Sequence, residues 1–191
     1  MRSWSSPPNL NSPWRVTHTA DAASPSMRIK LRNAPKNSKA QPARPRTPAP
    51  VIAAPPARVW RAITDPEQIA QWFSPGTSWD MTKLAVGGRL FVRDAESGAE
   101  LYPQEITLLD EPHQLALRSI VDPPETPKLS LYTLREEAAG TRLTITHSGY
   151  ELDPEGAREP AMEQNAFGFG MMLGNIKAVV EGLPLPTPGG F

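Results

Sequence analysis

The sequence predicts an α+β protein in which an antiparallel sheet of about six strands packs against one long C-terminal helix. Three observations lead to this fold class. Apolar residues recur at helical spacing between 160 and 182, whereas in five runs between 87 and 149 they alternate with polar ones. Only short breaks separate those five runs, and parallel strands would need helical crossovers of about a dozen residues or more.

The elements before the five runs are one short strand and two short helices. PAPVIAAPP predicts a strand at about residues 50–54 that is ended by two prolines. PPARVWRAIT follows as a helix with one apolar face, and proline is favoured at its first turn. DPEQIAQWF predicts a second helix, with Asp65 as N-cap, Pro66 at the first position and Gln68 completing a capping box.

The alternating runs make up most of the predicted sheet. Strands joined in sequence order by short turns form an antiparallel meander. Glycine and proline mark the breaks, at Gly98, Glu111-Pro112, Pro123-Pro124 and Ala139-Gly140. The runs are GGRLFVRDA, ELYPQEITLLD, HQLALRSIV, KLSLYTLREE and TRLTITHSG.

The last element is a helix with one continuous apolar stripe. Pro160 suits its first turn and Gly182 its C-terminal cap, which predicts about 22 residues and a length of roughly 33 Å. Three glycines lie inside it, Gly168, Gly170 and Gly174, although glycine is unfavourable within a helix. They indicate either a close approach to the sheet or room left for a ligand. The stripe consists of Met162, Ala166, Phe169, Leu173, Ile176 and Val180.

Composition divides the chain into three parts. Residues 1–48 carry nine Lys/Arg side chains, eight prolines and a single acid, Asp21, so we expect a disordered basic tail. Residues 49–183 form the predicted domain, and 184–191 a flexible C-terminal tail. Met27 lies inside the first part, and a start of translation at this residue is a hypothesis.

Composition also excludes several functions. The absence of cysteine excludes disulfides and thiolate chemistry, and it is compatible with the cytoplasmic location that we expect. After the tail, 11 basic and 19 acidic side chains disfavour nucleic-acid binding. No apolar run reaches the roughly 20 residues of a membrane span. We expect no cofactor and no metal, because His18 lies in the tail and His113 follows a turn, without a paired-ligand spacing.

Four separated segments, APPARVWRAITDPEQIAQWF, VGGRLFV, GTRLTITHSGY and GFGMMLGNIKAVVEG, together resemble the START-like (SRPBCC) superfamily. Within it, residues 50–183 are most similar to the branch named after the C-terminal domain of the activator of the Hsp-ninety chaperone ATPase. The resemblance implies a helix-grip fold, a curved antiparallel sheet around the C-terminal helix with an apolar cavity between them. One departure is Gly168-Phe169, where family members usually carry Gly-Trp, so an indole N–H is lost.

His147 is the main candidate for a residue that contacts a ligand or transfers a proton. Alternation in GTRLTITHSGY places Leu143, Ile145 and His147 on the face of the last strand that looks towards the helix. A histidine there either contacts a ligand or transfers a proton, since its usual pKa is near neutrality, or it only ends the strand, bonded to backbone or water. No catalytic partner for it is evident in the sequence.

Three hypotheses about function follow. The leading one is binding of a small apolar or amphipathic molecule between sheet and helix, with Tyr132 and His147 as polar contacts. The second is a cyclase- or hydrolase-type enzyme using His147 as general base. The third is a co-chaperone-like interaction protein, for which we would expect a further N-terminal domain. Ligand, turnover and oligomeric state stay open. The predicted lining residues are Trp72, Phe73, Leu90, Tyr132, Leu143, Ile145, His147, Phe169, Met172 and Leu173.

Overall fold

A computed structural model describes residues 49–74 and 76–189. The predicted basic tail, 1–48, lies outside these residues, as do the last two of the predicted C-terminal tail. Within the described ranges, no helix has the length and hydropathy that crossing a bilayer requires.

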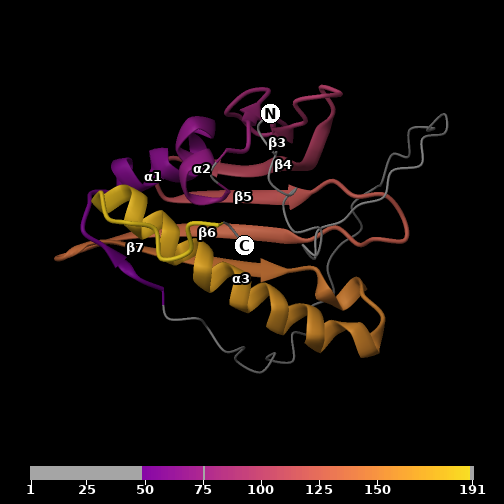
Figure 1. Ribbon diagram of the computed structural model, residues 1–191. Coiled ribbons are helices and arrows are strands. Elements are labelled where there is room, and N and C mark those ends of the chain that lie inside the picture. Colours follow the sequence, from indigo (N-terminus) through magenta and orange to yellow (C-terminus); the bar gives the residue numbers. More distant parts are fainter. Residues whose placement is uncertain (1–48, 75, 190–191) are drawn as a thin grey trace, which may run out of the picture. The chain divides into compact units, whose positions relative to one another are not determined.

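The predicted α+β fold with an antiparallel sheet is confirmed (Figure 1). Seven strands lie in the order β1-β7-β6-β5-β4-β3-β2, every neighbouring pair antiparallel. The strand missing from the prediction is β2, whose three residues are too short to show an alternating pattern. The strands are β1 Val51–Ile52, β2 Trp79–Met81, β3 Arg89–Arg93, β4 Glu100–Asp110, β5 Gln114–Ser119, β6 Leu129–Glu137 and β7 Gly140–Ser148.

The two predicted short helices follow β1 as α1, Pro56–Thr64, and α2, Pro66–Trp72. Asp65 caps α2 as predicted, because its Oδ1 accepts a hydrogen bond from the backbone N–H of Glu67 at 3.0 Å. The reciprocal bond of the capping box is not made. Gln68 donates to the Asp65 carboxylate at 3.3 Å, while the Asp65 N–H already bonds the carbonyl of Arg61 at 3.0 Å.

The C-terminal helix α3, Glu155–Glu181, is five residues longer at its start than predicted and follows a short 3₁₀ turn, η1, Tyr150–Leu152. Pro160 therefore lies inside the helix and not in its first turn. The helix tolerates it because only one backbone hydrogen bond is lost near the end, and the carbonyl that its ring approaches belongs to Gly156. Gly182, at φ 71°, caps the other end as predicted.

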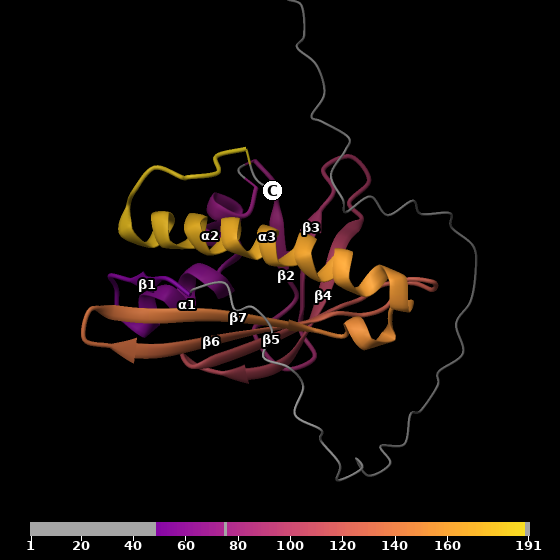
Figure 2. The same ribbon diagram turned by 90° about the horizontal axis from the view of Figure 1, so that it is seen from below.

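The core lies on the concave face of the sheet, and one end of α3 closes it. Figures 1 and 2 show α1 and α2 beside the C-terminal half of α3, with the N-terminal half extending past them over the other end of the sheet. All buried residues of α3 fall in this covered half, from Met172 to Ala178. The largest fully buried side chains of the domain include Ile52, Val59, Trp60, Ile69, Ile106, Leu143 and Ile176.

The edge strand β1 is fastened to both β7 and α3. The Lys177 ammonium donates to the carbonyl of Val51 at 2.8 Å, and Glu181 accepts from the N–H of Ala53 at 2.7 Å. On the other side, Gly140 has φ 132°, and a Cβ there would lie 2.0 Å from the carbonyl oxygen of Ile52. Glycine is therefore required where the β6–β7 turn meets β1.

Asn175 is a fully buried polar residue that connects three segments. Its Nδ2 donates to the carbonyl oxygens of Trp72 (2.9 Å) and Thr187 (2.8 Å), and its Oδ1 accepts from the Thr187 N–H at 3.0 Å. The carboxamide thus joins the end of α2 to α3 and holds the chain beyond α3 as far as residue 187. The flexibility predicted for residues 184–191 stays a prediction, and Thr187 is the attachment point from which it would begin.

Replacing this residue tests how much the connection stabilises the domain. We expect Asn175→Leu to lower the free energy of unfolding by about 2–3 kcal/mol, because three hydrogen bonds are lost and the carbonyl of Trp72 is left buried without its partner. Urea denaturation measures the change. Gln164→Ala, on the exposed side of α3, is the control and should change stability by less than about 0.5 kcal/mol. An Asn175→Leu protein as stable as the native one would contradict this role.

Candidate functional site

The ten predicted lining residues separate into two groups. Six are sealed in the core and cannot meet a ligand without its opening: Trp72, Leu90, Tyr132, Leu143, Met172 and Leu173. Four are half-buried at the margin of that core: Phe73, Ile145, His147 and Phe169. The structure therefore brings all ten to the concave side of the sheet but leaves only the second group accessible.

Half-buried apolar side chains lie close together where the middle of α3 passes over the sheet. Phe169 on α3 lies opposite His147 on β7, with ring centroids 4.8 Å apart. Ile145 precedes His147 on the same face of β7. Met81 on β2 and Leu101 on β4 continue this incompletely covered surface across the sheet. This end of the concave face is less tightly closed than the end beneath α1 and α2.

His147 reaches this position through strand alternation, as predicted, and through its register with β6. His147 pairs with Ser130, and the Ser130 Oγ lies 2.8 Å from the imidazole Nδ1. The Tyr150 ring lies on another side of the imidazole, at 5.4 Å between centroids. Ser130 was not predicted as a site residue, although the alternation in KLSLYTLREE places it on the same face as Tyr132.

The surroundings of His147 keep its imidazole uncharged. Burial is the main cause and the charge of Lys128 the second, and together they lower the pKa of His147 from its usual 6.5 to about 4. At neutral pH the ring therefore acts as a neutral hydrogen-bonding group. A base of such low pKa takes up a proton poorly, which favours a contact role over general base catalysis.

Lys128 and Asp153 form a polar border beside the histidine. The Lys128 ammonium lies 2.6 Å from the Asp153 carboxylate and 5.5 Å from the centre of the Tyr150 ring. Hydrogen bonds from Lys128 and Thr126 hold the pKa of Asp153 below its usual range. Asn165 on α3 donates to the Tyr150 hydroxyl at 2.8 Å. These contacts fasten η1 and the start of α3 to β6, so the rim of the site is ordered by ionic and polar bonds.

A second aromatic group lies at the opposite edge of the sheet. Phe73, at the end of α2, packs edge-on against Trp79 of β2, with centroids 4.9 Å apart. Trp72 beside it donates its indole N–H to the carbonyl of Ala62 at 2.7 Å. Trp79 was not predicted as a lining residue because β2 itself was not recognised. Its pairing with Val92 places it on the concave side.

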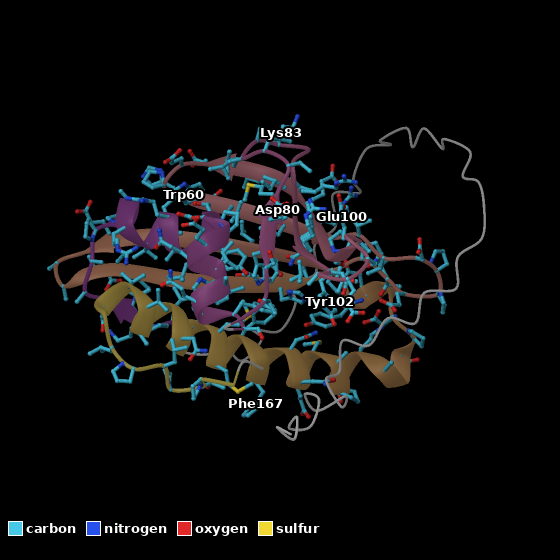
Figure 3. The ribbon with its side chains drawn as sticks, turned by 45° about the horizontal axis from the view of Figure 1, so that its top comes forward. Trp60, Asp80, Lys83, Glu100, Tyr102 and Phe167 are labelled. Carbon is cyan, nitrogen blue, oxygen red and sulfur yellow. The ribbon has the colours of Figure 1, made fainter. Side chains whose placement is uncertain are left out.

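Two of the glycines of α3 lie beside a hollow on the surface of the helix and not at a close contact with the sheet. Gly170 and Gly174 face away from the sheet and border an open, apolar hollow of about 430 Å³. A Cβ at Gly174 would lie 3.3 Å from Pro186, so glycine lets the chain after α3 pack closely on this side. Phe167, 72% exposed, points outward here (Figure 3). The hollow is lined by Ala166, Phe167, Gly170, Met171, Gly174, Pro186 and Thr187.

The low pKa of His147 predicts a pH-dependent stability. The unfolded residue titrates near 6.5 and the folded one near 4, so on acidification the unfolded state takes up the proton first. Above pH 6.5 the titration of His147 does not reduce the free energy of unfolding. As the pH falls to 4, it lowers this free energy by about 3 kcal/mol. An NMR titration of the His147 ring should give a midpoint near 4, and urea unfolding should show the loss of stability.

Two variants test why the pKa of His147 is low and how it affects stability. Lys128→Met should raise the His147 midpoint without restoring 6.5, since burial is the larger cause. His147→Asn should remove this part of the pH dependence of stability. A midpoint near 6.5 in the native protein would show that the ring is solvated, contrary to the packing described above.

Comparison with known proteins identifies the family. The family model described as activator of Hsp90 ATPase homolog 1-like protein matches residues 53–181. None of the curated proteins gives a match. Among solved structures, protein MLL2253 of Mesorhizobium loti is 23% identical, with a TM-score of 0.55 over 70% of this chain and 94% of its own.

Two further structures share the fold. Protein NE0264 of Nitrosomonas europaea is 20% identical, with a TM-score of 0.54 over 70% of this chain and 91% of its own. CalU16 of Micromonospora echinospora is 23% identical, with a TM-score of 0.52 over 71% of this chain and 73% of its own. At these identities the likeness concerns the fold alone. The family model, however, spans most of the described residues, and the chain belongs to the activator of Hsp90 ATPase homolog 1-like family of the SRPBCC superfamily.

Proposed function

We propose that this protein binds a small apolar or amphipathic molecule between the concave face of the sheet and the middle of α3. One observation carries the proposal: two apolar side chains, Ile145 on β7 and Phe169 on α3, stay half-buried beside the contact between the Phe169 and His147 rings. Apolar surface in contact with water is unfavourable, so a ligand that covers these side chains would lower the free energy of the complex. Ligand binding is also known in this family.

The residues of the proposed site have distinct roles. Phe73, Ile145 and Phe169 supply apolar contact, and His147 supplies a neutral polar contact next to Ser130. The six sealed residues of the predicted set belong to the core that adjoins this site. A site of this kind, mostly apolar with few polar groups, matches the usual composition of small-molecule sites.

Two phenylalanines of α3 provide a matched test. Phe169 faces the sheet and Phe167 faces the opposite side, so both can be replaced by alanine in the same helix. Native mass spectrometry of the protein from its own cells should first reveal a bound molecule. Phe169→Ala should then weaken binding of that molecule, or of butylbenzene as a probe, by about tenfold or more, because a phenyl contact is removed.

Phe167→Ala is the control and should leave the affinity unchanged. Circular dichroism should show both variants folded. Equal effects of the two substitutions would place the ligand elsewhere, and an empty protein that binds no probe would exclude the proposal.

A hydrolase is the second candidate, favoured by the contact of 2.8 Å between Ser130 Oγ and His147 Nδ1. A serine next to a histidine is the arrangement of an activated nucleophile. The low pKa of His147 argues against it, since an effective base at neutral pH needs a pKa near 7. Hydrolysis of a p-nitrophenyl ester distinguishes the candidates. An enzyme would lose turnover in both Ser130→Ala and His147→Ala, whereas the binding protein shows no turnover before substitution.

A further inference from the structure

Two tryptophans of the described residues bury an indole N–H without a hydrogen-bond acceptor, Trp60 and Trp79. Trp72, by contrast, bonds the carbonyl of Ala62. A buried donor without an acceptor is unfavourable, and nearly all such groups in proteins are paired with protein or water. The indole N–H donates and cannot accept, so a missing partner must be an acceptor atom.

The two indoles lie in different surroundings. Trp60 is 1% exposed and belongs to the closed end of the core, in α1, next to the fully buried Val59 (Figure 3). Trp79 is 8% exposed and lies in β2, an edge strand of the sheet on which the end of α2 packs. Its ring is covered by Phe73, which is itself half-buried. Trp79 therefore has a half-buried aromatic neighbour at the margin of the core, whereas Trp60 lies next to a fully buried residue.

Strand alternation fixes the direction in which Trp79 points. The next residue, Asp80, faces the other side of the sheet, where its carboxylate pairs with Arg93 at 2.7 Å. Trp79 and Met81 therefore face the concave side, opposite Val92 and Leu90 of β3. This is the side that α3 covers, and His147 faces it from β7. The unpaired donor thus lies on this side of the sheet and next to Phe73, one of the residues of the proposed ligand site.

We infer that Trp79 donates its indole N–H to an oxygen of the bound molecule, and that the ligand is an apolar molecule bearing a carbonyl or ether oxygen. The inference rests on the proposed function and specifies which kind of apolar molecule the site would bind. A hydrocarbon would fill the same apolar space but leave the N–H unpaired. A ligand whose polar atoms only donate, such as an ammonium, would leave it unpaired too. The expected contact is an N···O distance of roughly 2.7–3.2 Å.

A pair of probes with nearly the same shape tests this preference. Butylbenzene and 4-phenyl-2-butanone differ by one ketone oxygen, and only the ketone can accept from Trp79. Isothermal titration should show that Trp79→Phe lowers the ratio of ketone affinity to hydrocarbon affinity by about 5- to 10-fold. Trp60→Phe is the matched control, since it removes the other orphaned N–H at the closed end, and it should leave that ratio unchanged.

The native protein offers a second measurement that needs no stable variant. In ¹⁵N-labelled protein the indole N–H resonance of Trp79, assigned by triple-resonance NMR, should move downfield with the ketone and not with butylbenzene. The resonance of Trp72, whose N–H is already bonded, should not follow this pattern.

The outcomes separate this inference from the proposed function. If neither probe binds, the proposed function fails and this inference falls with it. If both probes bind with the same affinity ratio in native and Trp79→Phe protein, the site stands and the inference is overturned. A Trp79 N–H resonance that does not move when the ketone is bound would overturn it as well.

Discussion

The seating of the C-terminal half of α3 against α1, α2 and β1 is the constraint on which the rest of the domain depends. The helix has 27 residues, about 40 Å at the usual rise, whereas α1 and α2 have nine and seven. The short helices therefore fill the space beneath one half of α3 only. The other half passes over the sheet with partly exposed side chains beneath it. A single difference in length thus creates both a sealed core and an incompletely covered surface.

The polar groups of the interior differ in how completely they are paired. At the closed end, Asn175 satisfies its carboxamide with three hydrogen bonds to segments far apart in sequence. Towards the less covered end, His147 shares one hydrogen bond with Ser130 and is held neutral by burial. At the far edge, Trp79 buries an indole N–H without an acceptor. The carboxamide of Asn175 is thus fully paired, whereas an indole N–H lacks an acceptor both at Trp60, in the closed part of the core, and at Trp79.

The sequence was most informative about elements and least informative about which side of an element faces what. Periodicity identified α1, α2, five of the strands and α3, but three residues of β2 were too few to show a pattern. Trp79 was missed with that strand, and Ser130 was missed because it becomes a neighbour of His147 only by strand pairing. For the glycines of α3, the pattern indicated a special role but not that Gly174 adjoins Pro186 on the outer side.

The sequence by itself determined the fold class and the family, because local periodicity and turn residues specify helices and strands and their order allows few arrangements. It also determined that Leu143, Ile145 and His147 share one face, since alternation is a local property of a strand. Only the tertiary structure decided which apolar residues are sealed and which stay accessible. That distinction depends on contacts such as the one between Asn175 and Trp72, 103 positions apart, and no local pattern records such a contact.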